Sequence, residues 1–194
     1  MNKKFLETIK VKDGKIFHLP YHQCRLERAL GNESFSLESI ITPPKEHGLF
    51  RCRVVYDAEG CEVNYYPYKK RTINRLKVVY DNSIVYDKKY LDRTALEGHF
   101  EQKESADDIL LVKNGLITDT SIANCAFLYR GEWLTPKEPL LMGTTRARLL
   151  DGGKIQEAEI SVEDIEKFEG MALMNAMIDF DIIRTKSIED IIIC

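Results

Sequence analysis

Hydrophobic and polar positions alternate along the first part of the chain in the pattern expected of β-hairpins. Residues 5–11 alternate, Asp13-Gly14 supplies a turn, and residues 16–19 resume the pattern. A second pair of alternating segments, 50–56 and 61–68, flanks a polar turn. The start of the chain therefore predicts two antiparallel hairpins.

Helical spacing appears between these hairpins. Residues 21–30 place their apolar side chains on one side and are followed by Gly31, which predicts a helix that ends there. A short second helix is predicted at 37–41, stopped by Pro43-Pro44. An almost continuous apolar run at 76–80 predicts a buried strand.

The pattern of hydrophobic and polar residues changes after residues 81–83, which form the best candidate for a domain junction. Beyond it the pattern predicts helices at 89–102, 145–150 and 162–168, the last with Ser161 as N-cap, and strands at 109–112, 116–118, 126–129, 155–160, 172–175 and 181–184. The mixture indicates an α+β protein. We expect two domains, a small N-terminal α+β domain (1–80) and a larger, strand-rich domain (81–194) that binds a cofactor.

Composition excludes several classes of protein. With 194 residues, of which 44% are hydrophobic and 30% charged, the chain resembles an ordinary soluble domain pair. A net charge of -3 argues against nucleic-acid binding. No run approaches the ~20 apolar residues of a membrane span, and Met1 to Phe5 leads straight into a strand pattern without an apolar signal region. We therefore expect a cytoplasmic protein without a membrane partner.

Cysteine and histidine usage predicts no metal site. The five cysteines form an odd set without a close pair at metal-ligand spacing, and the four histidines do not supply the missing ligands. Reduced structural thiols are the expected state.

Three groups of polar residues could carry chemistry. Lys89 offers an amine, Asp119 a carboxylate, and the Gly143 to Thr145 turn a set of backbone N–H donors before an apolar helix. Pyridoxal phosphate requires these groups: an amine for a Schiff base with its aldehyde, a carboxylate for its ring nitrogen, and N–H donors for its phosphate. A lysine becomes a useful nucleophile when its pKa is lowered or a carbonyl cofactor captures it.

Each group also has an ordinary structural interpretation. Lys89, like its neighbour Lys88, could be a solvated helix residue, and Asp119 could form an Asx turn beside two threonines. The glycine before the helix could be a plain helix start. Arg25 on the first helix could bind phosphate bidentately or form a surface salt bridge with Glu27 or Glu33.

The order of these residues resembles the aminotransferase class IV family, which includes branched-chain aminotransferases, D-amino acid aminotransferases and 4-amino-4-deoxychorismate lyases. The resemblance covers nearly the whole chain. Its segments are Phe5 to Val11, Asp13 to Lys15, His22 to Leu26, Lys89 to Arg93, Asp107 to Leu110, Asn114-Gly115, Asp119 to Asn124, Leu134 to Pro136, Gly143 to Arg146 and Met174 to Ala176.

The resemblance implies a D-amino acid aminotransferase-like fold that binds pyridoxal 5'-phosphate, and a homodimer with substrate bound near the subunit interface. It also implies the roles of single residues. Lys89 forms the Schiff base, Asp119 faces the ring nitrogen, and the phosphate is bound by Arg25, Thr144, Thr145 and groups near Asn175 and Ala176.

The chain departs from the family in three places. Asp119 stands where the family normally has a glutamate, which is one methylene longer. The segment between Arg25 and Lys89 is short, so the chain is a shortened member. Glu59-Gly60 replaces an Arg-Gly pair that binds the substrate carboxylate in some members, which leaves Arg51 and Arg53 as weaker candidates.

The reaction itself has several possible forms. In the lyase branch of the family a threonine at the place of Thr8 is thought to help protonate the departing carbon skeleton, although Thr8 could equally be a β-branched strand residue. We expect an enzyme that acts on an amino acid or amino-carboxylate by transamination or elimination. The alternatives are a 4-amino-4-deoxychorismate lyase specifically, and a non-catalytic member that binds the cofactor or a metabolite without turnover.

Overall fold

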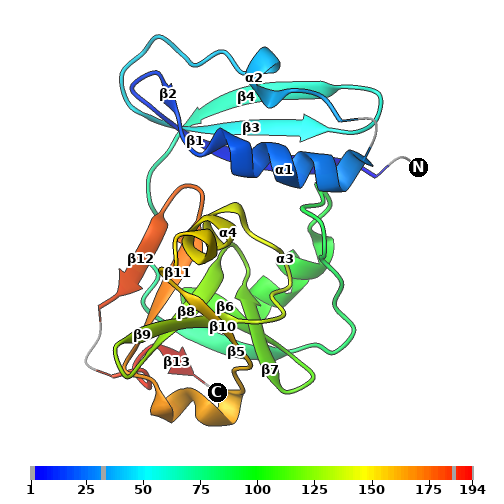
Figure 1. Cartoon of the computed structure of the whole chain (residues 1–194). Helices are drawn as coiled ribbons and strands as arrows, with labels where there is room; N and C mark the ends of the chain where they lie inside the picture. The colour runs from blue at the N-terminus through cyan, green and yellow to red at the C-terminus, as the bar shows by residue number, and fades with distance from the viewer. Residues whose placement is uncertain (1–2, 32–33, 185–186, 194) are drawn as a thin grey trace. The chain divides into compact units, whose positions relative to one another are not determined.

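The computed structural model describes residues 3–31, 34–184 and 187–193. It divides into two compact units (Figure 1). The first unit comprises residues 1–70 and 88–92, and the second comprises 71–87 and 93–194.

This division differs from the expected boundary after residue 80 for two reasons. The strand β5 (Leu76–Tyr80) pairs in parallel with β6 (Asp108–Lys113), so it belongs to the second unit. Residues 88–92 return to the first unit, where Tyr90 bridges Phe5 as an isolated β-bridge. The chain therefore crosses between the units three times.

The first unit holds a four-stranded antiparallel sheet in the order β2-β1-β3-β4. Its elements are β1 (Phe5–Lys12), β2 (Lys15–Ile16), α1 (Leu19–Leu30), α2 (Leu37–Ile40), β3 (Leu49–Tyr56) and β4 (Cys61–Pro67). Both predicted hairpins and both predicted helices are confirmed. The second strand of the first hairpin is shorter than predicted because α1 begins at Leu19.

The turn between β1 and β2 shows why the chain reverses there. Asp13 and Gly14 both have positive φ, 49° and 76°, as the tight turn of a two-residue hairpin requires. Aspartate and glycine are among the residues that adopt this conformation most readily. The pair identified in the sequence therefore has the predicted role.

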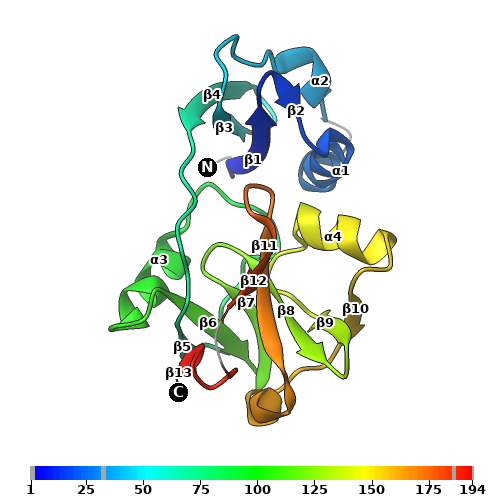
Figure 2. The same cartoon turned by 90° about the vertical axis from the view of Figure 1, so that its left-hand side faces the viewer.

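Helix α1 packs against one face of this sheet (Figure 2). Alternate residues of β1 and β3 point to this face and form a core with Leu26 of α1 and Leu37 of α2. The buried core residues of the unit are Phe5, Ile9, Val11, Leu26, Leu37, Ile41, Cys52, Val54 and Tyr56. Glu7 shares the alternation of Phe5 and Ile9, so its carboxylate also faces α1.

The second unit contains a nine-stranded sheet whose main path is β10-β9-β8-β7-β6-β5-β13, with β11 pairing with β8 and β12. Its other strands are β7 (Leu116–Thr120), β8 (Asn124–Tyr129), β9 (Glu132–Pro136), β10 (Gln156–Ala158), β11 (Gly170–Asn175), β12 (Asp179–Ile183) and β13 (Ile192–Ile193). Its helices are α3 (Thr94–Phe100) and α4 (Thr144–Asp151), with 3-10 helices η2 (Glu101–Lys103) and η3 (Val162–Lys167). The predicted α+β class is confirmed.

Two sequence predictions in this unit need correction. The helix predicted over 89–102 begins only at Thr94, because residues 89–91 pair with β1 instead. The helix predicted over 162–168 is a 3-10 helix; Ser161 stands at its N-cap as predicted, without a capping hydrogen bond from its side chain. Strands β9 and β13 were not predicted.

Two kinds of feature are absent from the described residues. No helix in the parts of the chain given above is long and apolar enough to cross a membrane. The same ranges contain no group of three or more histidine, cysteine or acidic side chains placed to hold a metal ion. Cys194 lies outside the described residues, whereas Cys24, Cys52, Cys61 and Cys125 are free thiols.

Candidate functional site

Lys89 lies at the edge of the sheet in the first unit. Its carbonyl accepts a hydrogen bond from the Leu6 N–H at 2.9 Å, which aligns residues 89–91 with the start of β1. The side chain is half-buried. Its positive charge is one of the causes that lower the pKa of His22, so the amine lies within electrostatic range of α1.

The neighbouring Lys88 has a different role. Its ammonium donates to the carbonyl of Ala29 at 3.2 Å and lies 5.7 Å from the centre of the Phe5 ring. Ala29 belongs to the last turn of α1, whose carbonyls have no partner within the helix and favour positive charge. Lys88 therefore lies at the C-terminal end of α1, where its ammonium is held by a backbone carbonyl.

Arg25 forms a bidentate ion pair with Glu7. Its Nε donates to Glu7 Oε1 at 2.8 Å and a terminal nitrogen donates to Glu7 Oε2 at 2.6 Å. The Arg25 side chain is 13% exposed, whereas Glu7 is fully buried. The two groups come together because Glu7 faces α1 from β1 and Arg25 lies on the sheet side of α1.

His22 completes this cluster from the preceding turn of α1. Its Nδ1 lies 2.6 Å from Glu7 Oε2, and the ring is 1% exposed. Residues three apart share a helix face, which brings His22 and Arg25 to the same carboxylate. An ionised carboxylate can only accept, so Nδ1 carries the proton and donates it.

The charge states of this cluster follow from burial and pairing. Burial alone would raise the pKa of Glu7, but the Arg25 charge and the hydrogen bonds from Arg25 and His22 lower it to about 2. Burial lowers the pKa of His22, and the charges of Arg25 and Lys89 add to this, although Glu7 opposes them. At neutral pH the cluster is thus an anionic Glu7, a cationic Arg25 and a neutral His22.

Thr8 lies on the other face of the same sheet. Neighbouring strand residues point to opposite faces, so Thr8 points away from Glu7 and α1. Thr8 is paired with Arg53 in the register of β1 and β3, and Lys10 is paired with Arg51. The structure therefore brings Thr8 together with Arg53, and not with Arg25.

Asp119 lies in the interior of the second unit, near the end of β7. The residue is 4% exposed. Its Oδ1 accepts from the Asn124 side-chain amide at 2.7 Å and its Oδ2 accepts from the Leu141 N–H at 2.8 Å. The structure thus supports the interpretation of Asp119 as a buried carboxylate rather than as part of an Asx turn.

A tight turn explains how Asp119 meets Asn124. The Thr120 N–H donates to the Ala123 carbonyl at 2.9 Å, and the Thr120 hydroxyl accepts from the Ala123 N–H at 3.0 Å. This turn joins β7 to β8 and pairs Asp119 with Asn124 across the ladder. A second constraint comes from Arg93, which donates to the Ser121 carbonyl at 2.8 Å.

The protonation of Asp119 is unusual. Burial raises the pKa of Asp119 to about 7, although the hydrogen bonds from Asn124 and Leu141 and the charge of Arg146 act to lower it. A buried acid that titrates near neutrality is a candidate functional group. A neighbouring cation would shift it toward the charged form.

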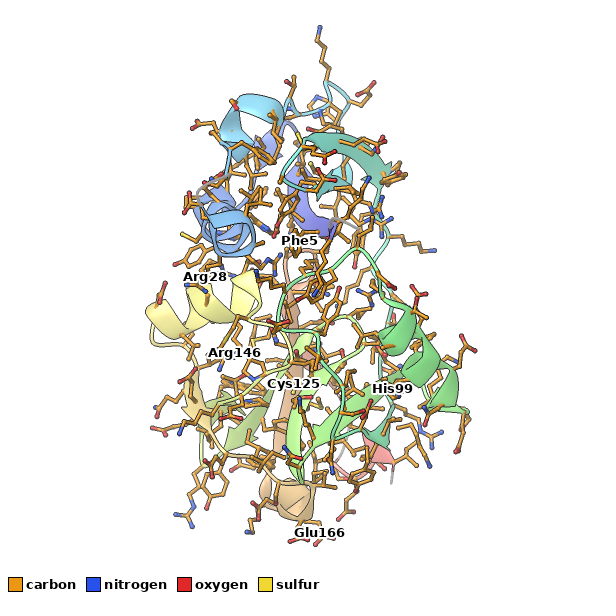
Figure 3. All side chains as sticks on the ribbon, turned by 90° about the vertical axis from the view of Figure 1, so that its right-hand side faces the viewer. Phe5, Arg28, His99, Cys125, Arg146 and Glu166 are labelled. Atoms are coloured by element: carbon orange, nitrogen blue, oxygen red, sulfur yellow. The ribbon has the colours of Figure 1, made fainter. Side chains whose placement is uncertain are left out.

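The loop that carries Leu141 is held by Arg146. This residue lies in the first turn of α4 and is 3% exposed (Figure 3). Its guanidinium donates to the carbonyl of Pro136 at 2.8 Å and to Glu157 at 2.7 Å. These bonds anchor the start of the loop that follows β9, and so position the N–H donors around Asp119.

The start of α4 provides N–H donors beside this carboxylate. Gly143 is the N-cap, and the buried residues Thr144 and Thr145 form the first turn, whose N–H groups have no partner within the helix. A Cβ on Gly143 would lie 1.9 Å from Asn124 Oδ1, so any other residue there would require the Asn124 side chain to move. The same asparagine therefore contacts both Asp119 and the N-cap of α4.

Asn175 is the last residue of β11, and Ala176 begins the turn that leads to β12. The Asn175 side chain shapes this turn: its Oδ1 accepts from the N–H groups of Met177 at 2.9 Å and Ile178 at 3.1 Å. Its amide nitrogen donates to the Ile122 carbonyl at 3.2 Å. The turn is thereby tied to the loop after Asp119, while α4 packs against β11 and joins β12 through Arg148 and Asp179.

Sequence analysis missed four residues of these clusters. Glu7 had a detectable signal, because it interrupts the apolar alternation at a position that faces the core. Asn124 also had one, since a hairpin places it opposite Asp119. The roles of His22 and Arg146 could not be assigned, although both lie in segments that carry the resemblance, because their partners depend on packing between distant segments.

Comparisons with known proteins identify relatives over most of the chain. A family model for amino-transferase class IV matches residues 69–185, more than half of the chain. A protein of Haemophilus influenzae, described only as uncharacterized, is 38% identical over 180 residues, which cover 88% of this chain and 96% of the relative. The solved structure of a candidate 4-amino-4-deoxychorismate lyase from Haemophilus somnus is 35% identical, with a TM-score of 0.84, covering 91% of this chain and 97% of the other.

A more distant structure bears on the fold alone. The pyridoxal-phosphate-bound form of a hypothetical aminotransferase from Mycobacterium tuberculosis has a TM-score of 0.75 at 16% identity and covers 96% of this chain and 83% of its own. The predicted two-part fold of the D-amino acid aminotransferase type is confirmed by these structures. The chain belongs to the aminotransferase class IV family.

Proposed function

We propose that the protein is a pyridoxal-phosphate-dependent enzyme that acts on an amino acid or amino-carboxylate, with a lysine Schiff base at Lys89. The observation that carries the proposal is Asp119, a buried carboxylate that titrates near neutrality and is fixed by two N–H donors. Membership of the family supports the cofactor, because the resemblance to that family implies it and a solved structure of the same fold is a pyridoxal-phosphate-bound form.

The groups that the cofactor requires are present in the chain. Lys89 offers an amine, Arg25 a guanidinium, Asp119 a buried carboxylate and the first turn of α4 a set of N–H donors. An anion placed at a helix N-terminus meets N–H donors and a favourable dipole. We therefore assign phosphate binding to Arg25, Thr144 and Thr145, and to the backbone of the turn at Asn175 and Ala176.

When bound, the cofactor supplies an electron sink for a negative charge at the substrate Cα. Asp119 stabilises a proton on the ring nitrogen, and this positive charge in turn favours the ionised carboxylate. The Lys89 Nζ would move the proton at the substrate Cα, as a general base and then as a general acid. The N–H donors of Asn124 and Leu141 hold the Asp119 carboxylate in a fixed orientation during this proton transfer.

The more specific proposal is a 4-amino-4-deoxychorismate lyase. The 35%-identical structure from Haemophilus somnus carries that candidate activity. Thr8, which we propose as the group that delivers a proton to the departing skeleton, lies in register with Arg53. A guanidinium beside Thr8 suits a carboxylated substrate, so we assign the substrate carboxylate to Arg53.

The cofactor test is spectroscopic. Purified protein incubated with the cofactor should absorb in the visible range, and borohydride should then fix the label on Lys89, as peptide mapping would show. Lys88→Ala is the matched control, because it removes the adjacent amine and should label normally. A protein that remains colourless and unlabelled would contradict the proposal, and a label on Lys88 would reject the site alone.

The alternative of a non-catalytic binder has its own readout. The replacement of the usual glutamate by Asp119 favours it. Bound cofactor whose spectrum changes with neither amino donors, keto acids nor aminodeoxychorismate would support that alternative. Spectral change with aminodeoxychorismate and release of pyruvate would identify the lyase.

The assembly and the location are also proposals. We propose a homodimer, in keeping with the family, and a cytoplasmic location. Sedimentation of the purified protein would test the dimer, and a monomer at micromolar concentration would contradict it.

A further inference from the structure

The buried Glu7 needs a physical explanation. It is a carboxylate with no solvent exposure, on a strand face that otherwise packs apolar side chains against α1. Burying a charge is costly unless it is paired and hydrogen-bonded. A protein with an apolar residue at this position would usually be at least as stable. Three short hydrogen bonds, two from Arg25 and one from His22, satisfy it.

We infer that Glu7, itself fixed by His22, is a positioning residue that orients the Arg25 guanidinium for the phosphate of the bound cofactor. This inference rests on the proposed function, since it takes Arg25 as a phosphate ligand. It adds a role for two residues that do not themselves touch the cofactor.

The geometry of the Arg25–Glu7 pair indicates that Glu7 orients the guanidinium and does not only neutralise its charge. Two parallel N–H···O bonds between planar groups fix both the position and the rotation of a guanidinium, which a single contact does not. An arginine side chain otherwise loses considerable rotamer entropy when a ligand immobilises it. With Glu7 in place, that entropy is lost on folding and not on binding.

His22 makes this arrangement specific. Because its ring is neutral, it holds Glu7 Oε2 by a hydrogen bond without adding a second positive charge to compete with Arg25. The carboxylate plane is thereby set by an element of α1 one turn before Arg25. If the Glu7 carboxylate were free to rotate, it would not fix the orientation of the Arg25 guanidinium.

Two physical models predict opposite signs for a Glu7→Gln variant. If Glu7 acted only as a charge, its negative field would weaken phosphate binding at Arg25, and the variant would bind the cofactor more tightly. If Glu7 orients Arg25, the variant loses the bidentate pair and binds more weakly. A charge-assisted hydrogen bond is worth enough for about a tenfold change.

The experiment compares the affinity for pyridoxal phosphate with that for pyridoxal, which lacks the phosphate, by absorbance or fluorescence titration. We expect Glu7→Gln to raise the Kd for pyridoxal phosphate by about tenfold and to leave the Kd for pyridoxal within about twofold of wild type. In an Arg25→Gln background the Glu7 substitution should have no further effect on phosphate-dependent affinity. Glu62→Gln on the exposed part of β4 is the matched control.

The outcomes separate the inference from the proposed function. Wild-type protein that binds neither compound would contradict the proposed function. Wild-type binding with Glu7→Gln unchanged, tighter, or equally weakened for both compounds would overturn the positioning role. Should Glu7→Gln fail to fold, the Arg25→Lys variant provides the test, because it keeps the positive charge but loses the planar guanidinium that makes two parallel hydrogen bonds. Retained affinity for pyridoxal phosphate would overturn the inference, and a phosphate-specific loss of affinity would support it.

Discussion

Asn124 donates its side-chain amide to Asp119 across the β7–β8 turn at 2.7 Å, and the same amide nitrogen donates to the Leu141 carbonyl at 2.8 Å. One side chain thus links the carboxylate to the loop that leads into α4. Because Leu141 also returns an N–H to Asp119, the two residues and the loop close a small hydrogen-bonded ring. The position of Asp119 therefore depends on contacts from two other segments of the second unit, β8 and the loop before α4.

The raised pKa of Asp119 predicts a specific dependence of stability on pH. Between about 3.8, the ordinary pKa, and about 7, the folded chain holds a proton that the unfolded chain releases. The free energy of unfolding should therefore fall as pH rises through this window, by up to about 1.4 kcal/mol per pH unit from this group.

Urea unfolding of the cofactor-free protein from pH 4.5 to 7.5, in parallel with Asp119→Asn, isolates this contribution. Wild type should lose stability relative to the variant as pH rises, since asparagine does not titrate. Parallel curves for the two proteins would show that the carboxylate is not desolvated in the folded chain.

Two substitutions of Asp119 should distinguish the effect of its negative charge on cofactor binding from the effect of its side-chain length. Asp119→Asn should weaken binding of pyridoxal phosphate by at least about tenfold, because a neutral amide does not hold a proton on the ring nitrogen. Asp119→Glu restores the residue usual in the family and should retain binding. Titration of each variant with cofactor measures the effect, and equal affinities for wild type and Asp119→Asn would argue against a ring-nitrogen partner.

Gly143 should tolerate no side chain while Asn124 is present. Its φ of -71° is open to any residue, so the constraint is steric: a Cβ would lie 1.9 Å from Asn124 Oδ1. Gly143→Ala should displace that side chain and cost about 1–3 kcal/mol of unfolding free energy, the penalty of unpaired buried groups.

The cost should shrink when Asn124 is also alanine, because the clash is then gone. Chemical denaturation of the two single variants and the double variant measures this coupling. Gly170→Ala is the control in the same unit, since a Cβ at Gly170 would meet no atom within 4 Å beyond its chain neighbours. Additive effects would show that the two positions do not share a contact.

Local pattern was sufficient to predict most of the fold. The period of two in β1 and the turn at Asp13-Gly14 depend on nearest neighbours, and both are present in the structure. The stretch at Lys89 was mispredicted as helix because its pairing partner, β1, lies more than 80 positions earlier in the sequence. Here an edge contact with a distant strand overrides the local helical pattern.

The candidate site was predictable only in part for a similar reason. Chemistry and order singled out Arg25 and Asp119, which the structure places against buried polar partners. The partners themselves, such as Glu7 and Arg146, contact groups 18 and 10 positions away, and sequence spacing does not specify those contacts. The residues that position a site therefore depend on packing between distant segments, whereas candidate reactive groups can be recognised from residue type.

Arg53, the proposed ligand of the substrate carboxylate, lies on the face of the first unit's sheet that points away from α1. Arg53 pairs in register with Thr8 and is half-buried, whereas Arg51 stacks on Tyr66 at 5.3 Å. Arg53→Gln should therefore raise KM for a carboxylated substrate by about tenfold, the value of one charge-assisted pair, with little change in kcat. Arg51→Gln is the matched control and should change KM less. Steady-state kinetics with aminodeoxychorismate would measure both parameters, and a fall in kcat at constant KM in Arg53→Gln would assign that arginine to the chemical step instead.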